Sequence, residues 1–571
     1  MYLQVGKSNG RTYLTIVQGY RDPVTKKVRR KTVKSLGYLD DLAKEYPDPI
    51  AHFRNVAAEM NENAALEKQP VTINLDPEEA LGLVGTNRKN IGYAALSKLY
   101  HELGLNIFFY NNSRAFKSEF NTNNIMKLLI FSRILAPASK KKTFEGKDRY
   151  FENMNFSLDD VYRCLSQVIT FKNPLQQHLH RQMENKFGRS TELVYYDVTN
   201  YYFETDRQDE LKRKGVSKEH RPNPIIQMGL LMDAKGIPVL YDLFPGNTND
   251  CETLMPVLDR VKREYQVGRT IIVADKGINT ADNIAFSLAK GDGYVYSQTV
   301  RGGNKELKDY VLDESGYHHI SDEFKIKSRL YPREIAVSNA WGGRSKIRID
   351  EKQVVFYSAD YARKAKADRE NALLKAHDLV KNPSKYNRSL SYGAAKYVKN
   401  LVFDPDTGEI MTTKQKPVFD EKKLREEEKF DGYYALVTSE WEKGDEEIVE
   451  IYRGLWRIEE AFKVTKSDLE ARPVYVSRHD HIQAHFLICF VALVIARLLA
   501  QCLGNKYSIP RIVESLNKAS GSRLEENWYV FDHADEITEA ITAELGIDLS
   551  RKYLRLGDIK NILGATKKPS I

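Results

Sequence analysis

Two aspartates in the middle of the chain each stand at the end of a run of β-forming residues. Asp197 follows Leu193–Tyr196, and Asp275 ends the run Thr270–Ala274. If the two runs form neighbouring strands, about 4.8 Å apart, the two carboxylates reach one spot. Carboxylate oxygens are the ligands that hard cations such as Mg²⁺ prefer, so such a pair could support metal-dependent chemistry.

A second set of polar residues recurs at every seventh position in a segment with helical apolar spacing. A helix is expected to begin near Gly444–Glu446 and to continue through Tyr452, Glu459 and Lys466. Seven residues are close to two helical turns, so these three side chains would project from one stripe. Ordinary surface charge is the competing interpretation, with Glu459 and Lys463 forming an ion pair across one turn.

The segments around the two aspartates follow a definite order of predicted strands and helices. The strand-like runs LVYYDVT, PIIQMGLLMD and IPVLYDLFPG precede an amphipathic helix, a buried strand (RTIIVADKG), a second helix and the strand GYVYSQTV. This β-β-β-α-β-α-β order resembles that of ribonuclease H-like nucleases, in which the first strand and the strand after the helix are neighbours. The sequence therefore predicts an α/β protein with a ribonuclease H-like mixed sheet.

The length and the changes in pattern predict several structural units, at roughly 100–200 residues per domain. The expected segments are a basic β-hairpin module (1–45), a helical, DNA-binding region (46–175), the first part of the catalytic domain (190–302), a β-rich insertion (303–431), the remainder of the catalytic domain with the Glu459 helix (432–504) and a helical C-terminal region (505–571).

The charge of the chain is compatible with a polyanionic partner. The net charge is +9, from 87 Lys and Arg against 78 Asp and Glu, which is modest for this length and also fits a slightly basic soluble enzyme. The second strand of the predicted hairpin gathers Arg29, Arg30 and Lys31. These residues could contact phosphates, or they could simply protect a solvated strand from edge pairing.

Cysteine usage and hydropathy favour a cytoplasmic protein. The four cysteines form no CxxC pair, which suits a reducing compartment. The apolar segment Ile482–Ala500 is uninterrupted only from Phe486 to Ala496, which is too short to span a bilayer and predicts a buried core helix. A protein without a membrane partner is expected.

Five segments taken together resemble the DDE transposases of bacterial insertion sequences. They are YYDVTNYYFE, GVSKEHRPNP, FPGNTNDCETL, VADKGINTADNI and YRGLWRIEEAFKVTKSDLEARPVYV, within about residues 190–500. The similarity is to the group with a Tyr-Arg-Glu-Lys signature and a β-rich insertion before the glutamate. The resemblance implies that Asp197, Asp275 and Glu459 are the catalytic, metal-binding carboxylates.

The same resemblance implies DNA-binding roles for the other signature residues. Tyr452 and Lys466 match the tyrosine and the lysine and would hold the terminal DNA phosphate. The family's arginine should fall where this chain has Leu455, which is a departure from the signature. Arg453 or Arg457 is a candidate for the arginine's phosphate-contacting role, although on a helix neither points in the same direction.

Three further residues admit more than one interpretation. His220 and Arg221, in the KEHRP segment, could donate to phosphates on the same surface, or they could belong to an ordinary loop. Trp456 could stack on a nucleic-acid base, although burial in the core is the favoured fate for this side chain.

The resemblance implies a cut-and-paste transposase that uses two Mg²⁺ ions, with Mn²⁺ as a substitute. Two such ions, about 3.5–4 Å apart, can clamp the attacking and leaving oxygens of an in-line phosphoryl displacement. The expected partner is double-stranded DNA, as terminal inverted repeats and as target, held by a homodimer in the synaptic complex. The alternatives are a metal-dependent, structure-specific endonuclease and a catalytically inactive DNA-binding derivative.

Overall fold

The structure is a computed structural model of the chain. It describes residues 1–8, 10–21, 28–66, 88–116, 118–218, 222–387, 390–404, 409–411, 416–524 and 527–568. The chain forms two compact units, Met1–Val84 and Gly85–Ile571. Each unit is described by itself below.

The N-terminal unit is a small antiparallel sheet with helices. Its strand order is β1-β2-β3, and Leu14, Ile16 and Val17 of β2 are buried. The predicted hairpin is confirmed as β2 and β3, whereas β1 is an additional strand that sequence analysis missed. The unit extends beyond the predicted module because α2 packs on β1. The elements are β1 (Tyr2–Ser8), β2 (Arg11–Arg21), β3 (Val28–Tyr38), α1 (Leu39–Leu42) and α2 (Pro49–Leu66).

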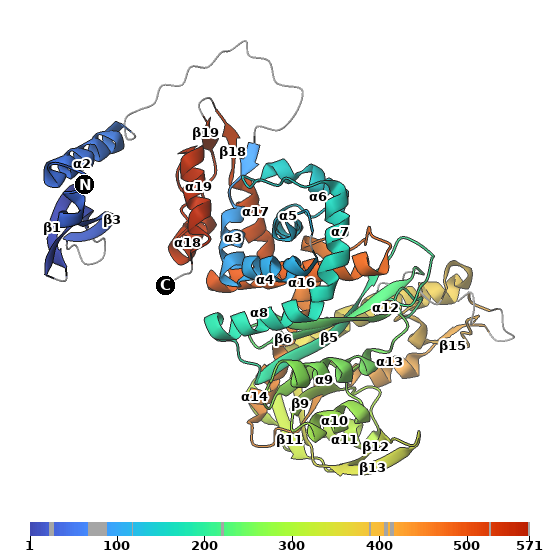
Figure 1. The fold of residues 1–571 in the computed structure, drawn as a ribbon. Helices are drawn as coiled ribbons and strands as arrows, with labels where there is room; N and C mark the ends of the chain where they lie inside the picture. The colour runs from blue at the N-terminus through green and yellow to red at the C-terminus, as the bar shows by residue number, and fades with distance from the viewer. Residues whose placement is uncertain are drawn as a thin grey trace. The chain divides into compact units, whose positions relative to one another are not determined.

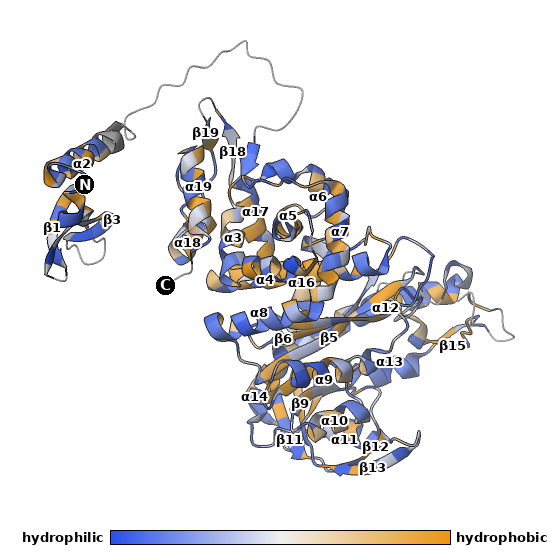
Figure 2. Cartoon of the chain, in the orientation of Figure 1, coloured by the Kyte–Doolittle hydropathy of each residue, from blue (hydrophilic) through white to orange (hydrophobic). Residues whose placement is uncertain are grey.

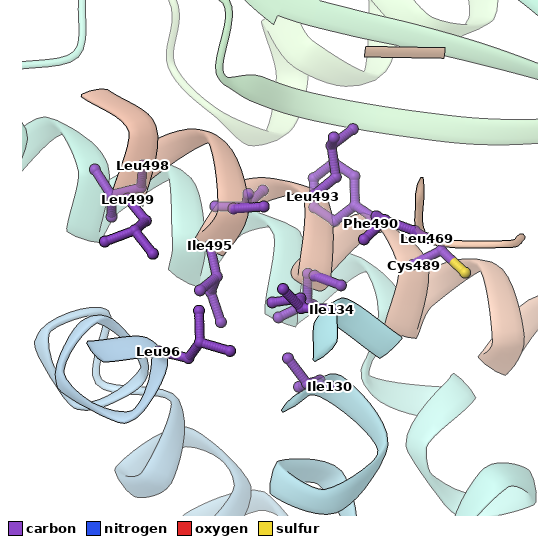
Figure 3. Packing of buried hydrophobic residues seen from close by; sticks show 14 of the residues in the cluster. Leu96, Ile130, Ile134, Leu469, Cys489, Phe490, Leu493, Ile495, Leu498 and Leu499 are labelled. Carbon is purple, nitrogen blue, oxygen red and sulfur yellow. The ribbon is translucent and has the colours of Figure 1, made fainter. Parts of the chain in front are cut away.

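A layer of helices in the second unit surrounds the long apolar helix α16 (His479–Cys502). Side chains of α3 and α5, including Leu96 and Ile130, meet Leu493 and Ile495 of α16 in the core that Figure 3 shows. The layer comprises α3 (Tyr93–Glu102), α4 (Leu105–Ser113), α5 (Thr122–Leu135), α6 (Lys140–Glu145), α7 (Leu158–Val168), α8 (Lys172–Phe187), α17 (Ile509–Lys518), α18 (Glu536–Leu545) and α19 (Leu556–Ala565).

Segments from both ends of this unit therefore build one layer. Helix α3 contacts α16, α18 and α19, and strand β4 (Arg88–Asn90) pairs with β18 (Ser520–Arg523) in a small sheet completed by β19 (Trp528–Phe531) and β20 (Tyr553–Arg555). The helices after residue 88 and the C-terminal region share a core, so they are not the separate segments that local sequence patterns indicated.

Helix α16 is the buried core helix that the sequence predicted. Within the described residues it is the one helix long and apolar enough to cross a membrane, and 89% of its most apolar window is buried inside the protein. In Figure 2 it is largely hydrophobic, whereas α8 at the surface is largely hydrophilic.

The central sheet has the predicted order of strands. Its core is β9-β8-β5-β6-β7, in which β5, β6 and β7 are antiparallel neighbours and β5, β8 and β9 are parallel. This arrangement confirms the ribonuclease H-like α/β fold (Figure 1). The strands are β5 (Leu193–Tyr202), β6 (Ile225–Asp233), β7 (Pro238–Pro245), β8 (Ile271–Ala274) and β9 (Gly293–Gln298).

Part of the expected insertion extends this sheet. Beyond β9 the order continues through β17, β14, β11 and β10, so the insertion is partly continuous with the catalytic sheet. The elements after β9 are α11 (Lys305–Leu312), β10 (His318–Ser321), β11 (Phe324–Leu330), β12 (Arg333–Ser338), β13 (Arg344–Ile349), β14 (Lys352–Ser358), α12 (Ala359–Lys381), β15 (Val398–Lys399), β16 (Val418–Phe419), α13 (Glu421–Glu428) and β17 (Tyr433–Thr438).

The two faces of the central sheet are covered by different helices. Tyr195 and Val273 belong to the core shared with α14 (Asp445–Arg453), α15 (Trp456–Lys463) and α16. Val194 and Ile272 belong to the core with α9 (Leu254–Glu264) and α10 (Ala281–Ala289). Because side chains alternate along a strand, odd-numbered residues of β5 and β8 face α14–α16. Asp197 is therefore on that face.

Candidate active site

Asp197 and Asp275 occupy equivalent positions on neighbouring parallel strands. In the pairing of β5 with β8, Tyr195 lies opposite Val273. Continuing this register by two residues places Asp197 opposite Asp275, the residue that directly follows β8. Neighbouring strands lie about 4.8 Å apart, so the two carboxylates share one place at the carboxyl edge of the sheet.

The electrostatics of Asp197 agree with this position. Burial raises the pKa of its carboxyl to about 7, the positive charge of Lys218 opposes the rise, and the negative charge of Asp275 adds to it. The amide of Val198 donates a hydrogen bond to Asp197 Oδ1 at 2.7 Å. Two carboxylates with little solvent between them thus repel each other, which is the situation that a bound cation relieves.

Lys218 lies beside Asp197, and sequence analysis did not single it out. Its ammonium group donates to the carbonyl oxygen of Val198 and pairs with Asp250 at 3.5 Å. These contacts hold a cation beside Asp197 and attach the segment before residue 219 to β5. The residue lies in the quoted motif GVSKEHRPNP, but nothing in the local pattern separated it from the other basic residues there.

A tight turn fixes Asp275. The amide of Gly277 donates to Asp275 Oδ1 at 2.8 Å, and the amide of Ile278 donates to the carbonyl of Asp275 at 3.2 Å. A side chain at position 277 would have its Cβ only 3.1 Å from Asp275 Oδ1. The glycine of the VADKG motif therefore leaves room for the carboxylate before α10 begins.

The helix predicted as continuous from about 445 is broken, which corrects the expectation of one stripe. It consists of α14 (Asp445–Arg453), α15 (Trp456–Lys463) and a π-helical turn (Val464–Asp468). A Cβ atom at Gly454 would lie 1.8 Å from the hydroxyl oxygen of Tyr195, which donates to the carbonyl of Ile451 at 3.2 Å. The break lies directly on the strand that carries Asp197.

The phenol of Tyr452 lies near the carboxylates of both Asp275 and Glu459. Burial raises the pKa of its phenol, a hydrogen bond with Ser297 of β9 opposes the rise, and the charges of Asp275 and Glu459 both add to it. Glu459 also raises the pKa of Tyr434 on β17, where burial is the main cause. The third carboxylate is exposed on α15, over the same face of the sheet as the aspartates.

The aspartate pair fits a divalent metal, and Glu459 stands apart from it. Both aspartates offer hard oxygen donors at one place, the donor chemistry that Mg²⁺ prefers. Among the described residues, however, no three His, Cys, Asp or Glu side chains are gathered closely enough to hold an ion. The two aspartates are thus the preformed part of the expected three-carboxylate set.

Lys466 lies close to the carboxyl edge of the sheet. Its ammonium nitrogen lies 5.6 Å from the ring centroid of Tyr201, which is on β5 beyond Asp197 and on the same face. Lys466 is therefore close to the strand that carries the first aspartate, although the π-helical turn takes it out of the expected stripe with Tyr452 and Glu459.

Neither candidate replacement for the signature arginine lies beside the aspartates. Arg453 pairs with Glu450 at 2.5 Å and lies 5.0 Å over the ring of Phe324 on β11. Arg457 lies over the ring of Trp456 and packs against Gly236 in the turn between β6 and β7, which is beside the first residues of β5.

Two other expectations near these residues have clear outcomes. Leu455 is buried in the core, with 6% of its surface exposed, so this position offers no polar contact. Trp456 is 54% exposed, which contradicts the expected burial of its side chain. His220 and Arg221 lie outside the described residues.

The predicted basic strand is exposed in the N-terminal unit. Arg29, Arg30 and Lys31 all lie on β3 with exposed side chains, and Arg30 and Lys31 pair with Gly19 and Gln18 of β2. The strand thus presents consecutive cations to solvent. A DNA-binding role for them stays a prediction.

The strand order, with acidic residues at the carboxyl edge of its central parallel strands, defines the class of ribonuclease H-like nucleases and polynucleotide transferases. The chain belongs to the DDE transposase family, since residues 196–495, more than half of its length, match the model described as "Transposase DDE domain". Residues 4–70 match the model described as "IS1634 family transposase, N-terminal domain", which makes it a transposase of the insertion-sequence type.

Comparisons with individual proteins give less information about this chain than the two family matches. No curated protein matches the chain. A solved structure described as "Mos1 transposase paired-end complex with left transposon end" is similar at 11% identity, with a TM-score of 0.14, over 30% of this chain and 57% of that chain. The matched region thus spans little more than half the length of that relative.

Proposed function

We propose that this transposase cleaves DNA at the ends of its own element and joins the freed 3′-hydroxyl groups to target DNA. Asp197, Asp275 and Glu459 are the residues that carry the reaction. The observation that supports this most strongly is the shared register of Asp197 and Asp275 on adjacent parallel strands. Cleavage is attack of water on phosphorus with release of the 3′-hydroxyl, and joining is attack of that 3′-hydroxyl on a target phosphodiester with release of a target 3′-hydroxyl. Each step is a direct displacement, so no covalent protein intermediate is required.

The aspartate pair would hold Mg²⁺, with Mn²⁺ as a substitute, and Glu459 would complete the set of ligands. When bound, two such ions supply Lewis-acid stabilisation to the attacking and leaving oxygens of an in-line displacement at phosphorus. Asp197 and Asp275 would bind these ions and hold them at the carboxyl edge of the sheet. Lys218 offsets part of the negative charge of the pair through its position beside Asp197.

The remaining site residues would position the DNA. Tyr452, whose phenol is held by Ser297, and Lys466, beside Tyr201, flank the carboxylates and are suited to contact the terminal phosphate. Hydrogen bonds from a phenol and an ammonium group to a phosphate fix orientation without demanding a particular base. Substrate position, rather than base identity, is thus the contribution of these two residues.

End recognition is assigned to the N-terminal unit. The consecutive cations on β3 would contact the backbone of the terminal inverted repeats, because phosphate contacts supply most of the affinity of DNA-binding proteins. Two ends must be held at once for excision, so the active form would be a homodimer on DNA. The reaction would take place at the nucleoid of a bacterium or archaeon.

A paired cleavage and joining assay tests this proposal. The wild-type protein with Mg²⁺ is incubated with DNA bordering its own gene and with a supercoiled plasmid. We expect nicks at defined ends and joined products in the plasmid. Cleavage without joining would indicate a structure-specific endonuclease, and binding without cleavage in Mg²⁺ or Mn²⁺ would indicate an inactive derivative.

A further inference from the structure

The π-helical turn that follows α15 has an irregular exit. The amide of Leu469 donates to the carbonyl of Val464 at 2.8 Å. The amide of Ala471 donates to the carbonyl of Thr465 at 3.0 Å. These bonds span five and six residues, whereas those of an α-helix span four. The turn therefore gives Lys466 a different direction from the one that a continued α-helix would give it.

The chain leaves this turn through a residue with an unfavourable backbone conformation. Glu470 has a φ of 41°, in the left-handed region that few residues other than glycine adopt. Its side chain is exposed, whereas its neighbours Leu469 and Ala471 are fully buried. Leu469 belongs to the core that Figure 3 shows. Such a backbone conformation persists only where the surrounding structure holds it in place.

A buried arginine of α5 binds the carbonyl groups of this exit. Arg133 is 5% exposed, and its Nη1 donates to the carbonyl oxygens of Leu469 and Glu470 at 3.2 and 3.3 Å. Its Nη2 donates to the carbonyl oxygen of Ala138 at 3.0 Å. Carbonyl groups at the end of a helix lack partners within the helix, and hydrogen bonds from a charged donor are strong ones. The guanidinium thus holds the unfavourable residue directly.

Helix α16 binds the next carbonyl group of the exit. His485 is buried, and its Nε2 lies 3.0 Å from the carbonyl oxygen of Ala471. A carbonyl oxygen only accepts, so Nε2 carries the proton and donates. The adjacent residue of α16, Phe486, packs against the ring of Tyr201, with ring centroids 4.9 Å apart. Helix α16 therefore fixes both the end of the turn and the ring beside which Lys466 lies.

We propose that Arg133 and His485 are positioning residues, which hold the carbonyl groups of residues 469–471 and thereby aim Lys466 at the terminal DNA phosphate. Both side chains are buried and act through the turn. Without these donors the exit can relax from its left-handed φ and the turn can return to α-helical register. A shift of one residue in register rotates a side chain by about 100° around the helix axis. This inference rests on the role of Lys466 in the proposed function.

A role of Arg133 in stability alone would give a different result, and a second cation of α5 provides the matched control. Lys127 is 4% exposed, as buried as Arg133, but it pairs with Glu152 in the segment before α7 at 3.3 Å. Lys127→Met should lower the thermal midpoint, because it leaves a carboxylate without its partner. Below that midpoint its cleavage rate should equal that of wild type.

The main experiment is a double-mutant cycle between Arg133 and Lys466. Single-turnover cleavage of a duplex carrying one end of the element is measured with Mg²⁺, below the thermal midpoint of every variant. We expect Arg133→Met to slow cleavage by up to about 100-fold, since a small displacement of a positioning group has this effect. Lys466→Ala should then add little to the loss in the double variant. Arg133→Lys, which keeps a charged donor, should recover part of the rate.

Position 470 provides an independent readout of the same role. Glycine adopts a left-handed φ far more readily than glutamate does, so Glu470→Gly should restore part of the cleavage rate that Arg133→Met loses. Glu470→Ala removes the same carboxylate without easing the backbone, and it should restore nothing. Recovery with glycine alone connects the loss to the conformation of the exit, which a general loss of stability would not do.

Two variants of His485 keep the inference testable if Arg133→Met does not fold. His485→Gln retains an N–H donor for the carbonyl oxygen of Ala471, whereas His485→Leu has none. We expect cleavage by His485→Gln within a few-fold of wild type, and a loss of about 10-fold or more in His485→Leu. Equal rates for the two variants would contradict a role for this hydrogen bond.

The outcomes separate this inference from the proposed function. A loss in Arg133→Met/Lys466→Ala equal to the product of the single losses would overturn the inference, as would wild-type cleavage by Arg133→Met. Equal recovery with Glu470→Gly and Glu470→Ala would also overturn it. If Lys466→Ala alone cleaves like wild type, the assigned role of Lys466 fails, and if Asp197→Asn still cleaves, the proposed active site fails, whatever the Arg133 variants do.

Discussion

Asp197 and Asp275 lie opposite each other in the register of two parallel strands, although a helix and two antiparallel strands separate them in the chain. The pairing of Tyr195 with Val273 fixes this relationship, because side chains two residues further along each strand must point to the same face. The geometry arises from backbone hydrogen bonding and does not depend on any contact between the carboxylates themselves. It is therefore present before metal or DNA binds.

Removing either aspartate should abolish catalysis without abolishing DNA binding. We expect Asp197→Asn and Asp275→Asn each to reduce end cleavage by more than about 100-fold, since even outer-shell partners of metal ligands are worth about 10–100-fold. Gel-shift affinity for the end duplex should stay within a few-fold of wild type. Substantial cleavage by either variant would remove that aspartate from the site.

The junction of α14 and α15 should be intolerant of a side chain at Gly454. Gly454→Ala places a Cβ atom 1.8 Å from the Tyr195 hydroxyl oxygen, so the helix or the ring must move, at a cost of about 1–3 kcal/mol. The thermal midpoint and the cleavage rate should both fall, because the junction positions Glu459 over β5.

A control and a double variant make this prediction specific. Gly564, in α19, has open space around its Cβ position, so Gly564→Ala should stabilise the helix slightly or leave it unchanged. Combining Gly454→Ala with Tyr195→Ala should cost less than the sum of the single changes, since the two residues are in contact. Additive effects would show that the ring of Tyr195 does not restrict this junction.

The stability of the helical layer should depend on the charge of Lys140. Its side chain is buried with its nitrogen 3.4 Å from His485 Nδ1. The pKa of Lys140 is lowered to about 7, mainly by burial and also by the charge of Arg133, while Cys489 opposes the shift. The unfolded chain binds this proton up to about pH 10.4, so the folded state is penalised below pH 10.4. The penalty is largest below pH 7 and is not changed by further acidification.

We therefore expect Lys140→Met to stabilise the protein on the order of 1–3 kcal/mol at pH 8. The stability of the wild type should rise relative to that of the variant as the pH increases from about 7 to about 10, because in this window the folded side chain has lost its proton while the unfolded chain still binds one. Thermal unfolding at several pH values measures this rise. Lys98→Met is the matched control, because Lys98 is equally buried but pairs with Glu102 at 3.0 Å, and its loss should destabilise. A Lys140→Met protein that is less stable than wild type at pH 8 would contradict the assignment.

Local sequence patterns predicted individual strands and helices, but they predicted little of how distant segments pack together. The runs around Asp197 and Asp275 predicted the strand order because each strand is a short, dense stretch of β-forming residues, and the apolar run in α16 predicted a buried helix. The pairing of β4 with β18 and the packing of α3 on α16 join distant segments. Local patterns contain no information about such contacts.

In the candidate site, too, some residues could be predicted from sequence patterns and others depend on long-range packing. The aspartates could be found from their strands, and Glu459 from a family resemblance. The break at Gly454 depends on the ring of Tyr195, and the cation beside Asp197 depends on the fold of the segment that carries Lys218. Neither feature has a signature in its own neighbourhood, so a continuous helix and an ordinary basic loop were the natural expectations.

The consecutive cations on β3 should dominate the salt dependence of end binding. We expect Arg29→Ala/Arg30→Ala/Lys31→Ala to reduce the slope of log affinity against log salt by about 0.9 for each phosphate that the variant no longer neutralises. Anisotropy titrations over a range of salt concentrations measure the slope. Lys44, exposed and paired with Asp41 at 3.3 Å, provides a control, and an equal change in Lys44→Ala would argue against a specific role for β3.

Metal location tests the central claim most directly. Crystals of the protein with an end duplex and Mn²⁺ would be measured at the manganese absorption edge, with Asp275→Asn crystals as the comparison. We predict an anomalous peak coordinated by the carboxylates of residues 197 and 275, with Glu459 completing the ligands, and a weaker or missing peak in the variant. Manganese bound elsewhere, with both aspartates free of metal in a complex that cleaves DNA, would contradict the account.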